Sequence, residues 1–185
     1  MSRIDEAFKA VPRIKFLRAE YKDQYELDVP LPIGFEQTNS QPSTVRQMLL
    51  WLDPQLKDRV LDVGSGSGWT TALLAHLVGP DGTIYAVERI LELVQFGEEN
   101  CRQMSVHNML FFEAEKVYGL PEFAPYDRIL VSASATELPA QLLEQLKIGG
   151  RIVVPTKTSI HVINKVTDQN YTHSEYPGYV FVPLI

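Results

Sequence analysis

The chain has 185 residues, 45% of them hydrophobic, and a net charge of −6 at neutral pH. This length and composition predict one globular domain with enough apolar side chains for a buried core. The acidic balance and the lack of a basic run argue against a nucleic-acid partner, since binding to phosphates depends on clustered Lys and Arg. The sequence shows neither a signal segment nor an apolar stretch of about 18 residues, so we expect a cytoplasmic protein without a membrane partner.

The residue types that commonly bind metals do not have the spacing of a metal site. Cys101 is the single cysteine, which excludes a disulfide framework and a thiolate metal site. The four histidines have no ligand spacing. The sequence therefore predicts no metal site.

Apolar residues alternate between the helical and the strand period along the chain. We expect helices at residues 4–11, 43–52, 69–78, 90–104 and 138–146, and strands at 60–63, 83–87, 109–112, 128–132, 151–154, 159–166 and 179–183. Residues 13–43 are rich in proline and are predicted to be irregular. Gly149 and Gly150 are expected to end the helix before them. Strands alternating with helices predict a doubly wound, mostly parallel α/β sheet with helices on both faces.

The most informative segment is 59–69, Arg-Val-Leu-Asp-Val-Gly-Ser-Gly-Ser-Gly-Trp. A buried strand, a glycine turn and a helix N-terminus in this order present backbone N–H groups to a ligand. Trp69 stands where a dinucleotide fingerprint has its third glycine, and the Gly-Lys-Ser/Thr of a phosphate loop is missing. The G-x-G-x-G spacing resembles motif I of the class I S-adenosylmethionine (SAM)-dependent methyltransferases. A glycine turn without a ligand is the alternative.

A carboxylate follows at the spacing of a ribose-binding acid. Glu88 ends the next expected strand, 20 residues after Gly68. A carboxylate at this place in a βαβ unit can accept hydrogen bonds from both hydroxyls of a ribose. The alternative is an exposed acid that only favours the N-terminus of the next helix.

Two further segments resemble one family within this superfamily. Residues 28–42, Asp-Val-Pro-Leu-Pro-Ile-Gly-Phe-Glu-Gln-Thr-Asn-Ser-Gln-Pro, resemble the PLPIGxGQTISxP signature of protein-L-isoaspartate O-methyltransferases, and residues 124–133 resemble the family's APYDxIxVTA. The resemblance covers nearly the whole chain in order. It implies a class I methyltransferase-like, seven-stranded sheet with its last strand antiparallel. It also implies a single domain, with a cap and acceptor loop in residues 1–58 and a SAM-binding core in 59–185.

The resemblance implies methyl transfer from SAM to the carboxylate of L-isoaspartyl residues in damaged proteins or peptides; the ester then collapses through a succinimide and regenerates aspartate. It implies that Ser40 is the catalytic residue that holds the attacking carboxylate, and that Thr38 and Asp28 bind the substrate. The residues implied to bind SAM are Asp62, Gly64, Ser65, Gly66, Gly68, Glu88, Arg89 and Glu115. We expect a monomer. Ser40 as a helix cap and Asp28 as a turn residue are the alternatives.

Three departures from the family pattern leave other functions open. Glu36 replaces a glycine, Asn39 replaces an isoleucine, and Ala-Glu-Lys at 114–116 aligns with Gly-Asp-Gly. The first two, beside the expected acceptor site, suggest a SAM-dependent carboxyl methyltransferase with a different peptide or small acid as acceptor. The third suggests a catalytically weakened relative that only binds SAM.

Overall fold

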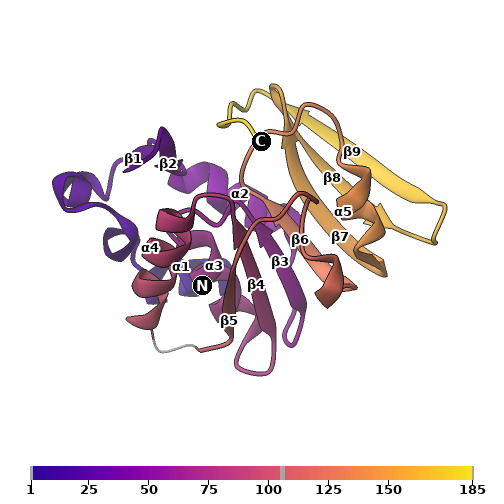
Figure 1. Ribbon diagram of the computed structural model, residues 1–185, viewed down its shortest axis with the longest axis horizontal. Coiled ribbons are helices and arrows are strands. Elements are labelled where there is room, and N and C mark those ends of the chain that lie inside the picture. Colours follow the sequence, from indigo (N-terminus) through magenta and orange to yellow (C-terminus); the bar gives the residue numbers. More distant parts are fainter. Residues whose placement is uncertain (1, 105–106, 185) are drawn as a thin grey trace.

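The computed structural model describes residues 2–104 and 107–184. Within them a seven-stranded sheet has the order β5-β4-β3-β6-β7-β8-β9 (Figure 1). Its strands are β3 (Arg59–Val63), β4 (Thr83–Glu88), β5 (Met109–Glu113), β6 (Tyr126–Val131), β7 (Leu146–Thr156), β8 (Ser159–Lys165) and β9 (Tyr171–Pro177). Strands β3 to β7 are parallel, and β8 is antiparallel to both of its neighbours. The doubly wound, mostly parallel sheet is confirmed, but the reversed strand is β8 and not the last one.

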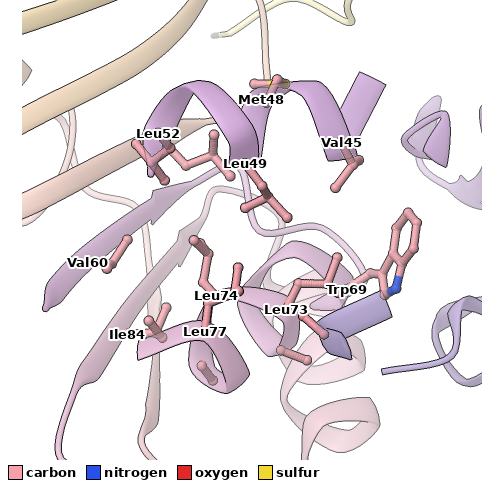
Figure 2. Close-up of a cluster of buried hydrophobic side chains, with 14 of the residues drawn as sticks. Val45, Met48, Leu49, Leu52, Val60, Trp69, Leu73, Leu74, Leu77 and Ile84 are labelled. Carbon is pink, nitrogen blue, oxygen red and sulfur yellow. The ribbon is translucent and has the colours of Figure 1, made fainter. Parts of the chain in front are cut away.

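Helices cover both faces of the sheet. On one face lie α1 (Arg3–Ala10), α2 (Pro42–Leu52), α3 (Trp69–Val78) and α4 (Leu91–Arg102), and on the other lies the short α5 (Ala140–Glu144). Along β3, Val60 is buried under the first group of helices and Leu61 is buried on the opposite face. Figure 2 shows Leu49 of α2 directed toward Leu73 and Leu74 of α3. Burial on both faces explains the continuous apolar run of this strand.

The N-terminal segment is more ordered than the sequence predicts. Residues 13–43, expected to be irregular, contain two 3-10 helices, Arg13–Phe16 and Ala19–Gln24, and a small antiparallel hairpin. The hairpin strands are β1 (Leu31–Gly34) and β2 (Gln37–Asn39). Phe35 and Glu36 form its tip, both with positive φ, at 54° and 59°. A run of prolines hides this hairpin because proline breaks the usual strand pattern.

The expected strand at 179–183 is wrong. The last strand is β9, Tyr171–Pro177, whose residues are all exposed. An exposed edge strand with polar side chains lacks the apolar alternation on which the prediction depended. Val182 and Leu184 instead pair through their backbones with Ser134, in the loop after β6, over distances of 2.7 and 2.8 Å.

The expected helix at 138–146 is too long. Helix α5 ends at Glu144, and Leu146 already belongs to β7, so Gly149 and Gly150 lie in a strand and do not end a helix. The pairing of β6 with β7 shifts register in this region, and Gly149 has φ +82°. An irregular strand entry of this kind carries no periodic signal.

None of the helices in residues 2–104 and 107–184 is long and apolar enough to cross a membrane.

Candidate active site

A cavity of about 320 Å³ opens where β3, β4, β5 and β6 end. Its walls come from the turn after β3, the start of the β4–α4 loop, the loop after β5, strand β2 and the C-terminal segment. The lining residues are Ile33, Gln37, Thr38, Asn39, Ser40, Val63, Gly64, Ser65, Gly66, Ser67, Trp69, Thr70, Val87, Glu88, Arg89, Ala114, Glu115, Lys116, Val117, Tyr118, Gly119, Ser132, Ala133, Val182, Pro183 and Leu184. The carboxyl ends of parallel strands are the usual place for a ligand in such a sheet.

The glycine turn is fixed against the end of β4. The backbone N–H groups of Gly64 and Ser65 donate to the Val87 carbonyl at 2.8 and 3.2 Å. Gly64 and Gly66 have φ values of +78° and +51°, a backbone region that favours glycine. The turn therefore has a defined shape before any ligand binds.

Glu88 is held by three backbone N–H groups. Its Oε2 accepts from Gly66 at 3.1 Å, and its Oε1 accepts from Arg89 at 2.8 Å and from Ile90 at 3.1 Å. The side chain is buried, at 8% exposure, yet it lines the cavity. A carboxylate oxygen has more than one lone pair, so Glu88 keeps the capacity to accept from a ligand. It is not simply an exposed acid at a helix N-terminus.

Ser65 supplies an unused polar atom at the same wall. Its Oγ is buried and has no hydrogen-bond partner among the residues that the structure describes. Buried hydroxyls are normally paired, so this one indicates a polar ligand group or water in the cavity. The Ser65 hydroxyl and the Glu88 carboxylate together fit a nucleoside that carries hydroxyl groups.

Asp62 lies behind the turn and is absent from the cavity lining. Its Oδ2 accepts from the hydroxyls of Thr71 at 2.7 Å and Thr70 at 3.1 Å, at the start of α3. Burial raises the pKa of Asp62 to about 6, and the two hydroxyl hydrogen bonds act in the opposite direction. Asp62 thus supports the strand-to-helix junction, and its contact with the cofactor stays a prediction.

Gly68 is also absent from the cavity lining. A Cβ added there would lie 2.7 Å from the Gly97 carbonyl oxygen and 2.9 Å from Cys101 Sγ, both on α4. Gly97 faces the same restriction, because its Cβ would lie 2.9 Å from the Gly66 carbonyl oxygen. The packing of α3 against α4 thus requires the third glycine of the motif. From the sequence, this glycine was expected to serve cofactor binding.

Replacing Gly68 with alanine is expected to lower the free energy of unfolding by about 2–4 kcal/mol. Overpacking accounts for about 1–3 kcal/mol and the left-handed backbone for about 1 more. Gly149→Ala is the matched control, since Gly149 has φ +82° against +83° at Gly68 but no atom within 4 Å of its added Cβ. Urea unfolding of both variants measures the difference, and equal losses would contradict the packing role.

Strand β2 and the residue after it carry the expected acceptor residues. Thr38 and Ser40 line the cavity. Helix α2 begins at Pro42 with Gln41 as its N-cap, and no hydrogen bond from a side chain at that position caps it. The alternative of Ser40 as the helix cap is therefore wrong.

Asp28 provides the cap instead. Its Oδ1 accepts from the backbone N–H of Ser43, in the first turn of α2, at 2.8 Å, and its Oδ2 accepts from Gln41 Nε2 at 3.1 Å. The hydrogen bonds from Ser43 lower the pKa of Asp28. Asp28 does not line the cavity. Asp28 thus caps α2 from 15 positions before Ser43, and its contact with the substrate stays a prediction.

Buried polar contacts that the sequence analysis missed join the two walls. Arg13 Nε donates to Asn39 Oδ1 at 2.7 Å, and Asn39 Nδ2 donates to Ser67 Oγ at 3.0 Å. All three residues are at most 5% exposed. In the sequence, Asn39 was noted only as a departure from the family pattern, and no pattern gave Arg13 or Ser67 a role.

Exposed charged residues form another part of the cavity wall. Arg89 and Glu115 both line the cavity and are exposed. The backbone N–H of Ala114 donates to the Glu88 carbonyl at 2.9 Å, so the loop after β5 starts directly beside Glu88. Of the predicted site residues, the cavity thus joins Thr38, Ser40, Gly64, Ser65, Gly66, Glu88, Arg89 and Glu115.

Comparison with known proteins identifies the family. A model of the protein-L-isoaspartate(D-aspartate) O-methyltransferase family matches residues 1–185. The chain belongs to this family. Proteins named protein-L-isoaspartate O-methyltransferase from Aeropyrum pernix and Methanopyrus kandleri are 44% and 40% identical to it. These matches cover 99% and 100% of this chain and 72% and 84% of the relatives.

Solved structures of the family have the same fold. One protein-L-isoaspartate O-methyltransferase superposes with a TM-score of 0.90 at 28% identity, and the match covers 100% of this chain and 61% of that one. The chain thus spans about three fifths of that protein's length. A putative protein-L-isoaspartate O-methyltransferase from Plasmodium falciparum, in complex with S-adenosyl-L-homocysteine, superposes with a TM-score of 0.89 at 24% identity, covering 100% of this chain and 91% of its own. This second match bears on the fold alone.

Proposed function

We propose that this chain carries out the reaction of its family in the cavity described above. The reaction is methyl transfer from SAM to the carboxylate of L-isoaspartyl residues in damaged proteins or peptides. The observation that carries the proposal is that one cavity is lined both by the glycine turn with Glu88 and by Thr38 and Ser40. A nucleoside cofactor and a carboxylate acceptor need such a shared space to react directly.

The residues of the first wall fit SAM, which when bound supplies an electrophilic methyl group on its sulfonium. Glu88 would accept from the ribose hydroxyls, as its fixed and buried carboxylate allows. The Ser65 hydroxyl, which has no partner among the described residues, would bind a polar group of the cofactor. Glu115 would accept a hydrogen bond from the adenine amino group, and Arg89 would contact the cofactor at the rim of the cavity.

The acceptor needs little chemical activation. An isoaspartyl carboxylate is already ionised at neutral pH, so no strong general base is required. The protein's contribution is to align two reactants, which can lower a barrier by about 7–11 kcal/mol. Ser40 would donate its hydroxyl hydrogen to one carboxylate oxygen, which leaves the other oxygen directed at the methyl group.

Neither of the two substitutions that suggested another acceptor presents a free side chain to the reacting groups. Glu36 is at the exposed tip of the β1–β2 hairpin and outside the cavity lining. The amide of Asn39 is engaged by Arg13 and Ser67. Both facts favour the isoaspartyl acceptor over a different peptide or small acid.

An acceptor panel tests this assignment. The chain is incubated with methyl-labelled SAM and an isoaspartyl peptide, a peptide with only a C-terminal carboxylate, or a small dicarboxylic acid. We expect base-labile methyl esters on the isoaspartyl peptide alone. Preferential labelling of either other acceptor would favour the alternative carboxyl methyltransferase.

The loop at 114–116 gives a separate prediction. Restoring Gly-Asp-Gly is expected to tighten SAM binding about threefold to tenfold, the scale of one net hydrogen bond, because it removes two side chains from a cavity wall. Calorimetric titration of S-adenosylhomocysteine measures the change, with Lys116→Gly alone as the partial variant. Unchanged or weaker binding would mean that Glu115 does not contact the adenine.

We propose that the partners of this chain are isoaspartyl-containing proteins and not nucleic acids. We also propose that the protein is a cytoplasmic monomer. Its single domain would consist of a cap, residues 1–58, and a core, residues 59–185. The net charge of −6 supports the exclusion of nucleic acid. Sedimentation analysis would test the monomer.

A further inference from the structure

Arg13, Asn39, Ser67 and Asn100 form a continuous buried network around the back of the cavity. Arg13 Nε donates to Asn39 Oδ1, Asn39 Nδ2 donates to Ser67 Oγ, and Asn100 Nδ2 on α4 donates to the Ser67 carbonyl at 3.0 Å. Each residue is at most 6% exposed. The network therefore joins the N-terminal segment, β2, the glycine turn and α4.

Arg13 fixes the backbone at Asn39 and Ser40 and in the segment before β1. Its guanidinium donates to the backbone carbonyls of Asn39 and Ser40, both at 3.1 Å. It also donates to the carbonyls of Leu27 at 2.9 Å and Val29 at 2.7 Å. Each acceptor is neutral, and burial lowers the pKa of Arg13 to about 10. The acceptor wall is thus held by hydrogen bonds whose loss would leave a buried cation poorly paired.

Asn39 is the link between this wall and the cofactor turn. Within the described part of the chain, one hydrogen bond joins a side chain of β2 to the turn at residues 64–68, and it is the bond from Asn39 to Ser67. Its neighbours Thr38 and Ser40 both line the cavity. The position of Asn39 therefore sets where the Ser40 hydroxyl lies relative to the turn.

We propose that Asn39 is a positioning residue for methyl transfer, which holds Ser40 at its working distance from the cofactor turn through Arg13 on one side and Ser67 on the other. This inference rests on the proposed function. The isoleucine that the family signature has at this place has no polar group and cannot make either contact. The chain thus fixes its acceptor wall by a polar link that the signature lacks.

Two variants break the link at different points. Asn39→Ile removes both hydrogen bonds, and Ser67→Ala removes only the contact with the turn. Each is expected to lower kcat for an isoaspartyl peptide about 10–100-fold, since a misplacement of about 1 Å can cost 100-fold. The affinity for S-adenosylhomocysteine should change less than about threefold, and the double variant should lose no more than Asn39→Ile alone.

Asn39→Asp is the conservative variant. Its carboxylate can accept from both Arg13 Nε and the Ser67 hydroxyl, so kcat should return to within about threefold of the wild type. Asn164→Ala is the matched control far from the cavity. Asn164 has the same chemistry on β8, accepting from Arg151 Nε at 2.6 Å and donating to Thr172 Oγ1 at 2.9 Å. It should leave kcat unchanged.

Hydrogen exchange of the ligand-free protein gives a readout independent of activity. Amides of residues 37–40 should exchange faster in Asn39→Ile and Ser67→Ala than in the wild type, Asn39→Asp or Asn164→Ala. Unchanged kcat in folded Asn39→Ile, or an equal loss in Asn164→Ala, would overturn the positioning role alone. A wild-type chain that binds S-adenosylhomocysteine but methylates no isoaspartyl peptide would overturn the proposed function and this role with it.

Discussion

Ser40→Ala is expected to lower kcat for an isoaspartyl peptide about 10–1000-fold and to leave the dissociation constant of SAM unchanged. The side chain lines the cavity and does not cap α2. Under the proposed function, its loss therefore removes a contact to the acceptor and no hydrogen bond that caps the helix. Ser40→Thr, which keeps the hydroxyl, should lose less activity, although its extra methyl group takes up space in the cavity.

Thermal unfolding of the same preparations separates catalysis from stability. Asp28→Ala serves as the comparison, because it removes the actual cap of α2 and should cost about 1 kcal/mol of stability. Ser40→Ala should unfold at the wild-type temperature. If it instead lost as much stability as Asp28→Ala and kept its turnover per folded molecule, Ser40 would have no catalytic role.

Gly66→Val is expected to abolish SAM binding in a protein that still folds. A Cβ at this position would lie 3.2 Å from Ile33 Cδ1, at the wall of the cavity, on a backbone with φ +51°. The branched side chain would therefore occupy ligand space and disturb the N–H group that holds Glu88. Glu88→Ala should weaken binding by about 1.5–3 kcal/mol, the scale of hydrogen bonds to a charged group.

Calorimetric titration with S-adenosylhomocysteine measures both effects. Glu99→Ala is the control, since Glu99 is exposed on α4 and pairs with Arg102 at the surface. It should bind as the wild type does. Wild-type affinity in both Gly66→Val and Glu88→Ala would show that the cofactor does not bind at the glycine turn.

Local sequence patterns predicted those parts of the site that lie in the turn after a strand or at the end of a strand. The turn at 64–68 follows a buried strand directly, and Glu88 ends the neighbouring strand, so chain order and the edge rule for parallel sheets bring them together. The same logic predicted most strands, because those buried on both faces have continuous apolar runs.

Contacts between distant residues could not be predicted in this way. Asp28 caps a helix that begins 14 residues later, and Gly68 is small because Gly97 approaches it from another helix. Neither requirement leaves a periodic pattern in the sequence. The same is true of Asn39, which at the sequence level was only a departure from the family pattern and in the structure joins two walls of the cavity.

The conversion of an isoaspartyl peptide in the presence of SAM tests the central claim most directly. Chromatography with mass detection follows this peptide and its aspartyl twin over many turnovers. We expect a methyl ester on the isoaspartyl peptide, then a succinimide, and then the aspartyl form, with no ester on the twin. A chain that binds SAM yet forms no ester on the isoaspartyl peptide, or esterifies both peptides equally, would contradict the proposed function.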